Sequence, residues 1–99
     1  MTDLLSDDER KTLIAPLQQT GWDYDREGRA ISKTFVFADF VAAFDWMTRV
    51  AQIAEDANHH PEWTNVYKTV TVTLTTHDAK GLTHKDITLA QDMDKAAQV

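Results

Sequence analysis

The strongest restriction on the fold comes from an alternation of threonine with valine or leucine in the stretch TVTVTLTT, residues 69–76. Successive side chains of a β-strand point to opposite faces, so this pattern predicts a strand over Asn65–Thr76 with one buried face. The residues expected on the apolar face are Val66, Val70, Val72 and Leu74. The residues expected on the opposite face are Tyr67 and the threonines, and His77 also belongs to this face if the strand extends that far.

The first part of the chain predicts a helix followed by a hairpin. Ser6-Asp7-Asp8-Glu9 is a capping box, so we expect a helix from about Asp7 to about Gln19, closed by Gly21. Two short strands are predicted at Trp22–Asp25 and Ala30–Val36, because the turn residues Arg26-Glu27-Gly28 separate them.

A long amphipathic helix is predicted to begin after an N-cap at Asp39 and to run to about Asn58. Its apolar stripe comprises Phe40, Phe44, Met47, Ala51 and Ala54, widened by Val41, Val50 and Ile53. The helix must stop near His59, since Pro61 forces His60 out of the helical region.

A last helix is predicted from the acidic capping box Thr83-His84-Lys85-Asp86 to about Ala97, after a turn at Gly81. The whole chain, 1–99, is expected to form one α+β domain with the order α-β-β-α-β-α. We expect a small antiparallel sheet of about four strands, with three helices packed on one face. The fourth strand lies in Glu62–Asn65 or comes from a partner.

The composition excludes several classes of function. Lys and Arg number 10 against 16 Asp and Glu, which gives a net charge of −6 and argues against nucleic acid or anionic membrane as partners. The absence of cysteine excludes disulfides and thiolate chemistry. The N-terminus lacks the apolar core of a signal peptide, and no apolar run is long enough to span a membrane, so we expect a cytoplasmic protein.

The stretch EDANHHPEW, residues 55–63, contains most of the candidate catalytic residues. Glu55 and His59 are four residues apart, so on a helix the carboxylate would hold the imidazole of His59. If the long strand runs back beside the helix end, His77 joins His59 and His60 at one pocket. Such a cluster suits general acid–base catalysis near neutral pH.

Other interpretations of these residues remain open at this stage. Three histidines can bind Zn²⁺, although adjacent histidines usually point apart and no HxH or HExxH spacing is present. A structural role is the third possibility. His84 is expected to be exposed, while Trp22 and Trp46 are expected in the core, although Trp22 could also line a pocket and stack on a flat ring.

The spacing of these residues resembles the signature of the pterin-4a-carbinolamine dehydratases. It consists of Glu55, then three residues to His59-His60-Pro61, and onward to Tyr67, His77 and Asp86. The resemblance extends from about Trp22 to Ala96. It implies an enzyme that removes water from 4a-hydroxytetrahydropterin to give quinonoid dihydropterin, which regenerates the pterin used by aromatic amino acid hydroxylases, with no metal and no cofactor.

The resemblance also implies roles for individual residues. His59 and His77 would be the acid–base pair, His60 would hold the substrate and Glu55 would orient His59. The substrate-binding residues would be Asn58, His59, His60, Thr75, Thr76, His77 and Asp78, with Trp22 as a further candidate. For Asp86 the simplest physical role is the third helical position of its capping box.

Members of this family form homodimers or homotetramers, so the resemblance implies a homo-oligomer. The wide apolar stripe of the long helix is consistent with an interface on one of its sides. A different function is a non-catalytic dimerisation or transcriptional cofactor module on the same fold. Such a module has no need to keep three histidines and Glu55 at this spacing, which favours the enzyme.

Overall fold

Local signals set the ends of the three helices in the computed structural model, which describes residues 3–98. Helix α1 (Asp7–Gln18) begins at its capping box, in which Glu9 N donates to Ser6 Oγ and Ser6 N donates to Glu9 Oε1. Helix α2 (Phe40–Ala57) is capped by Asp39, and α3 (His84–Ala97) begins at a second capping box. The helices predicted from the sequence are therefore confirmed.

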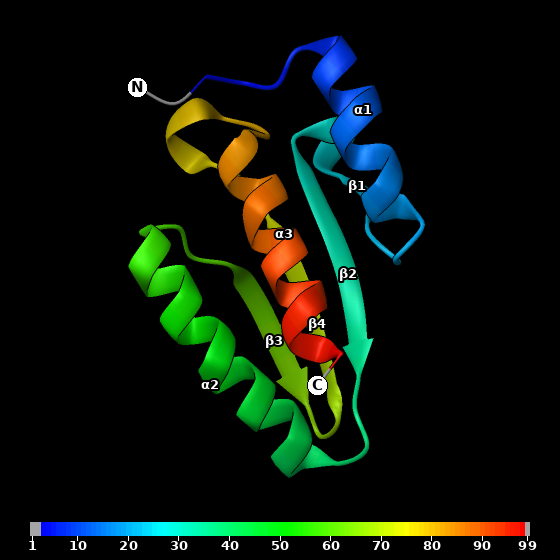
Figure 1. The fold of residues 1–99 in the computed structure, drawn as a ribbon, viewed down its shortest axis with the longest axis vertical. Coiled ribbons are helices and arrows are strands. Elements are labelled where there is room, and N and C mark those ends of the chain that lie inside the picture. The colour runs from blue at the N-terminus through cyan, green and yellow to red at the C-terminus, as the bar shows by residue number, and fades with distance from the viewer. Residues whose placement is uncertain (1–2, 99) are drawn as a thin grey trace.

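The sheet contains four antiparallel strands in the order β1-β2-β4-β3 (Figure 1). Strands β1 (Asp23–Asp25) and β2 (Ala30–Val36) form the predicted hairpin around the short 3-10 turn η1 (Arg26–Gly28). Strands β3 (Glu62–Val66) and β4 (Thr69–Leu74) form a second hairpin. The α+β class, with about four antiparallel strands and three helices, is confirmed.

The single long strand expected over Asn65–Thr76 is wrong. The chain reverses at Tyr67 and Lys68, and Tyr67 adopts a left-handed φ of 52°. Asn65 and Val66 belong to β3, so the fourth strand does come from the region after Pro61. His77 lies beyond β4, in a 3-10 turn, η2 (His77–Ala79), and does not extend the strand.

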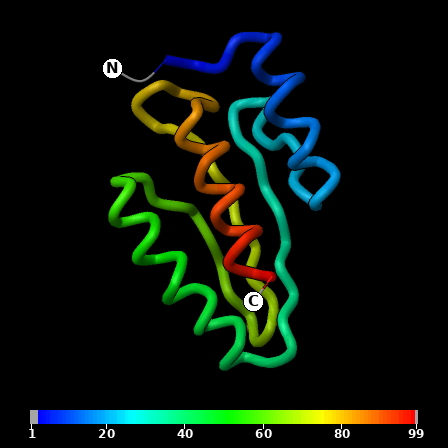
Figure 2. Tube along the Cα trace, viewed as in Figure 1, coloured from blue at the N-terminus to red at the C-terminus, as the bar shows by residue number. Residues whose placement is uncertain are grey.

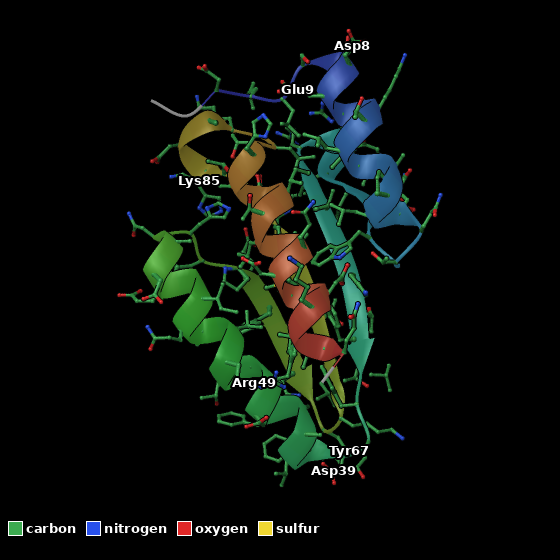
Figure 3. All side chains as sticks on the ribbon, viewed as in Figure 1. Asp8, Glu9, Asp39, Arg49, Tyr67 and Lys85 are labelled. Atoms are coloured by element: carbon green, nitrogen blue, oxygen red, sulfur yellow. The ribbon has the colours of Figure 1, made fainter. Side chains whose placement is uncertain are left out.

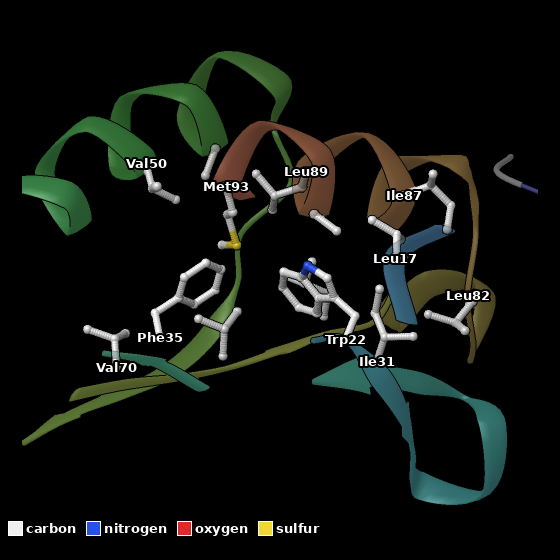
Figure 4. Packing of buried hydrophobic residues seen from close by; sticks show 14 of the residues in the cluster. Leu17, Trp22, Ile31, Phe35, Val50, Val70, Leu82, Ile87, Leu89 and Met93 are labelled. Atoms are coloured by element: carbon white, nitrogen blue, oxygen red, sulfur yellow. The ribbon is translucent and has the colours of Figure 1, made fainter. Parts of the chain in front are cut away.

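All three helices lie on one face of the sheet, which the trace in Figure 2 also shows. The apolar side chains of β4 face the helices, and Val70, Val72 and Leu74 are fully buried. Phe35 and Met93 close the core between β2 and α3 (Figure 4). The opposite face carries threonines, including Thr34 and Thr71, which are exposed.

The long helix buries part of the expected stripe, because Val50 and Ala54 are buried and Met47 and Ile53 pack against the core. Its buried side chains are Ala43, Trp46, Val50 and Ala54, whereas Phe40 and Phe44 are 46% and 54% exposed. Trp46 is a core residue as predicted, and its Nε1 donates to the carbonyl of Met93. Among residues 3–98, none of the helices has the length and apolarity needed to span a bilayer.

Candidate active site

The end of α2 determines where the two adjacent histidines lie. Asn58 takes a left-handed conformation (φ 51°), and the N–H of His59 donates to the carbonyl of Ala54 at 3.0 Å. This 6→1 bond is the Schellman arrangement that ends many helices. His59 and His60 therefore lie beyond the helix, and the chain enters β3 directly after Pro61.

A cavity of about 340 Å³ opens between this helix end and the end of β4. A volume of this size falls within the range of about 300–1,000 Å³ typical of small-molecule sites. All three histidines of the predicted cluster line it. The full lining is Asn58, His59, His60, Pro61, Glu62, Thr75, Thr76, His77, Asp78 and Lys85. Lys85 marks this end of the molecule in Figure 3, and Tyr67 lies at the opposite end.

His59 is held by a buried carboxylate from α3. Its Nε2 lies 2.6 Å from Oδ1 of Asp86, which is inaccessible to solvent. The other oxygen of Asp86 accepts from the backbone N–H of Thr83 (3.0 Å) and from the hydroxyl of Thr76 (2.8 Å). Because an ionised carboxylate only accepts hydrogen bonds, it selects the His59 tautomer with the proton on Nε2. In this tautomer Nδ1 carries no proton.

The expected pairing of Glu55 with His59 is wrong. Glu55 Oε1 lies 2.8 Å from Nε2 of His60, and both side chains are largely exposed. The i,i+4 rule fails here because His59 lies beyond the left-handed residue Asn58 and is no longer on the helix. His60, one residue further along, is the histidine that turns back toward Glu55.

His77 reaches the cavity from η2, and a carboxylate of β3 holds it. Its Nε2 lies 3.0 Å from Oε2 of Glu62. The Arg26 guanidinium binds the same carboxylate with two bonds of 2.6 and 3.0 Å. The hydrogen bond from Arg26, followed by that from His77, lowers the pKa of Glu62 to about 2. Glu62 is therefore an anion at neutral pH beside an exposed imidazole.

Trp22 does not belong to this site. Its side chain is 1% exposed, packs in the core and donates from Nε1 to Asp94. The proposed stacking role of Trp22 is therefore wrong. His84 is exposed as expected and pairs with Glu9 at 2.7 Å.

Glu62 and Lys85 line the cavity and Arg26 binds Glu62, although the sequence predicted none of these roles. Glu62 is part of the stretch EDANHHPEW, but its contact with His77 depends on the pairing of β3 with β4. Arg26 contacts Glu62 only because the β1–β2 hairpin places η1 at the end of the sheet where Glu62 lies. No local pattern in the sequence signals either contact.

Metal ligation does not fit the geometry of this cluster. Within the part of the chain that the structure describes, no group of three or more His, Asp or Glu side chains is arranged to hold a metal ion. Each of the three histidines instead directs Nε2 at its own carboxylate. The arrangement can hold three imidazoles in defined orientations around a small ligand and can exchange protons through the remaining ring nitrogens.

Fold and site together define a small α+β protein with a cluster of three histidines between a helix end and a sheet end. The sequence matches the family model described as pterin 4 alpha carbinolamine dehydratase over residues 3–96. A protein of Jannaschia sp. strain CCS1, provisionally named pterin-4-alpha-carbinolamine dehydratase, is 57% identical over 99% of this chain and 100% of its own length. The chain therefore belongs to the pterin 4 alpha carbinolamine dehydratase family.

Solved structures with a similar fold include the following two. A transcriptional coactivator/pterin dehydratase from Brucella melitensis has a TM-score of 0.88 and 39% identity, over 95% of this chain and 98% of that one. A pterin dehydratase-like protein identified as a RuBisCO assembly factor in the alpha-carboxysome has a TM-score of 0.68 at 19% identity, over 78% of this chain and 89% of that one. The second likeness concerns the fold alone.

Proposed function

We propose that the protein dehydrates 4a-hydroxytetrahydropterin to quinonoid dihydropterin, and so recycles the pterin cofactor of an aromatic amino acid hydroxylase. The observation that carries this proposal is the cavity lined by His59, His60 and His77. Each imidazole has one nitrogen on a carboxylate and one left over. Family membership supports the pterin as the class of substrate.

The reaction needs two proton transfers and no change of oxidation state. A base accepts the proton from N5 of the pterin, while an acid protonates the hydroxyl on C4a, which leaves as water. The electron pair of the N5–H bond then forms the C4a=N5 double bond. His59 and His77 act as this acid–base pair, since imidazole is the side chain that serves both roles near neutral pH.

The remaining lining residues hold the substrate. His60 and Asn58 contact it from the helix end, and Thr75, Thr76 and Asp78 from the end of β4. Backbone N–H and C=O groups at a strand end can pair with the flat amide edge of a pterin ring. Thr76 is buried and donates its hydroxyl to Asp86, so it also supports His59.

The test is stopped-flow dehydration of chemically generated 4a-hydroxytetrahydropterin. Loss of either proton-transfer group lowers the rate by about 10²–10⁴-fold, so His59→Ala and His77→Ala should lose nearly all acceleration. His84→Ala is the matched control, because His84 is exposed and does not line this cavity. A His59→Ala/His77→Ala double variant with full turnover would overturn the proposal.

We also propose that the protein is a homo-oligomer, in which α2 of one copy packs against another copy. The exposed side chains Phe40, Val41 and Phe44 on one side of α2 support this, as an apolar surface in contact with water favours association. The second candidate function, an interaction module without catalysis, rests on the same surface. It predicts that changes at Phe44 abolish function and that histidine changes do not.

A further inference from the structure

A second cavity of about 340 Å³ adjoins the active site on the far side of His77. It is lined by Arg26, Arg29, Thr75, His77 and Lys80, so it shares Thr75 and His77 with the catalytic cavity. Thr75 joins the two sides of the second cavity, because its hydroxyl donates to the carbonyl of Arg29 at 2.6 Å. A ligand that occupies the first cavity can therefore extend past His77 into the second.

The charge of this cavity is opposite to that of the chain. The protein carries −6 overall, yet three of its 10 Lys and Arg residues line this one cavity, with no Asp or Glu in the described lining. Concave surfaces lined by charges of one sign concentrate the opposite charge. Glu62 neutralises Arg26 from outside this lining, so Arg29 and Lys80 are the side chains that make the cavity a local cationic site on an acidic protein.

Two of the three cationic side chains are available for a ligand. Arg26 is engaged by Glu62 through two bonds. Among the described residues, Arg29 donates its Nε to the carbonyl of Arg26, and its terminal nitrogens make no hydrogen bond there. Within residues 3–98, Lys80 takes part in none of the salt bridges, which involve Arg26, Lys33, Arg49 and the histidines.

We propose that this cavity binds an anionic group, a phosphate, carried on the side chain of the same substrate whose ring occupies the catalytic cavity. Arg29 and Lys80 supply the charge, since guanidinium and ammonium groups bind phosphate oxygens through charge-assisted hydrogen bonds. The inference rests on the proposed function and narrows its substrate class to ring-reduced pterins with a phosphorylated side chain.

The experiment measures the affinity of a matched pair of 7,8-dihydropterins by isothermal titration calorimetry. Both carry the same polyol side chain, which ends in a hydroxyl in one and in a phosphate in the other. The wild type should bind the phosphate-ended ligand at least about tenfold more tightly, about 1.4 kcal/mol. A third titration with inorganic phosphate distinguishes phosphate borne by the substrate from a free phosphate ion.

The diagnostic variant is Arg29→Gln/Lys80→Gln, in which the affinity ratio should fall to near one. The matched control is Lys11→Gln/Lys68→Gln, which removes the same two charges at exposed positions outside both cavities and should keep the wild-type ratio. Equal affinities of the wild type for the two ligands, or equal ratios in the diagnostic and control variants, would overturn the inference. So would binding of inorganic phosphate as strong as that of the phosphate-ended ligand.

The two proposals fail in different ways. If the hydroxyl-ended ligand binds and the corresponding carbinolamine is dehydrated, but phosphate gives no gain, only this inference fails. If the wild type binds neither pterin and accelerates neither dehydration, both the proposed function and this inference fail.

Discussion

The Nε2 atom of His59 lies 2.6 Å from Oδ1 of Asp86, and solvent reaches neither Asp86 nor most of His59. The same carboxylate caps α3 through the backbone N–H of Thr83. One side chain therefore fixes the start of a helix and the orientation of an imidazole at the end of another helix. The site and the packing of α2 against α3 depend on each other through this contact.

Asp86→Asn should lower turnover by about tenfold or more, because an amide can present an N–H to Nε2 and so favour the wrong tautomer of His59. The free energy of unfolding should also fall, by about 1–3 kcal/mol, since a buried hydrogen-bond network loses an acceptor. Ser6→Ala is the control, because it removes the side-chain cap of α1 at a cost of about 0.5–2 kcal/mol and lies outside the cavity. If both variants lose stability but neither loses activity, Asp86 has only a structural role.

Glu55→Gln should be much milder than Asp86→Asn. Glu55 contacts His60, which we assign to substrate binding, so the change should raise KM about two- to threefold and leave kcat nearly unaltered. Steady-state dehydration kinetics of the two variants side by side check this. A kcat loss in Glu55→Gln as large as that in Asp86→Asn would mean that Glu55 does orient His59 during turnover.

Local rules predicted the helices correctly because capping is a local interaction. Ser6, Asp39 and Thr83 each accept from N–H groups within three residues, so the sequence alone contains the signal. The β3–β4 hairpin was missed because it turns at Tyr67 and Lys68, without the Gly or Asn that usually marks such a turn. The β-branched residues on both sides then resemble one continuous strand.

The candidate site was predicted as a set of residues but not as a set of contacts. The three histidines could be placed at one end of the sheet from the order of the elements. Their partners could not, because Asp86 is 27 residues from His59 and Arg26 is 36 residues from Glu62. Contacts of this kind depend on how helices and strands pack, and that information is spread over the whole core.

Glu62 should contribute to stability at neutral pH and lose that contribution in acid. Its pKa in the folded protein is about 2, against an ordinary value of 4.5, so the stabilisation is present above pH 4.5 and disappears as the pH falls toward 2. The side chain is 40% exposed, so solvent screening limits the effect to about 1 kcal/mol or less. Denaturant unfolding of wild type and Glu62→Gln should differ at pH 6 and converge near pH 2.

The control for this comparison is Glu27→Gln. Glu27 is an exposed carboxylate beside Arg26 in sequence, and it makes no ion pair within the described residues. Its substitution should leave the acid dependence of the wild type unaltered. A Glu62→Gln protein that follows the wild-type curve from pH 6 to pH 2 would show that the bonds from Arg26 and His77 do not stabilise the fold.

Phe44→Glu should weaken self-association without unfolding the protomer. Phe44 is 54% exposed and contacts Phe40, with ring centroids 5.7 Å apart, so the core does not depend on its side chain. A charge buried in an apolar interface without a partner is strongly unfavourable, and the variant should be smaller than the wild type by light scattering at equal concentration. Circular dichroism should show the same helix content for both.

Thr12→Glu provides the matched control, since it adds the same charge to an exposed position of α1 and should keep the wild-type mass. The activity of Phe44→Glu separates the two candidate functions. The histidine cavity lies at the other end of α2 from Phe44, so a dissociated protomer should still dehydrate the pterin. A wild type that is already monomeric would contradict the oligomer and leave the catalytic proposal intact, because no lining residue of the cavity comes from α2 upstream of Asn58.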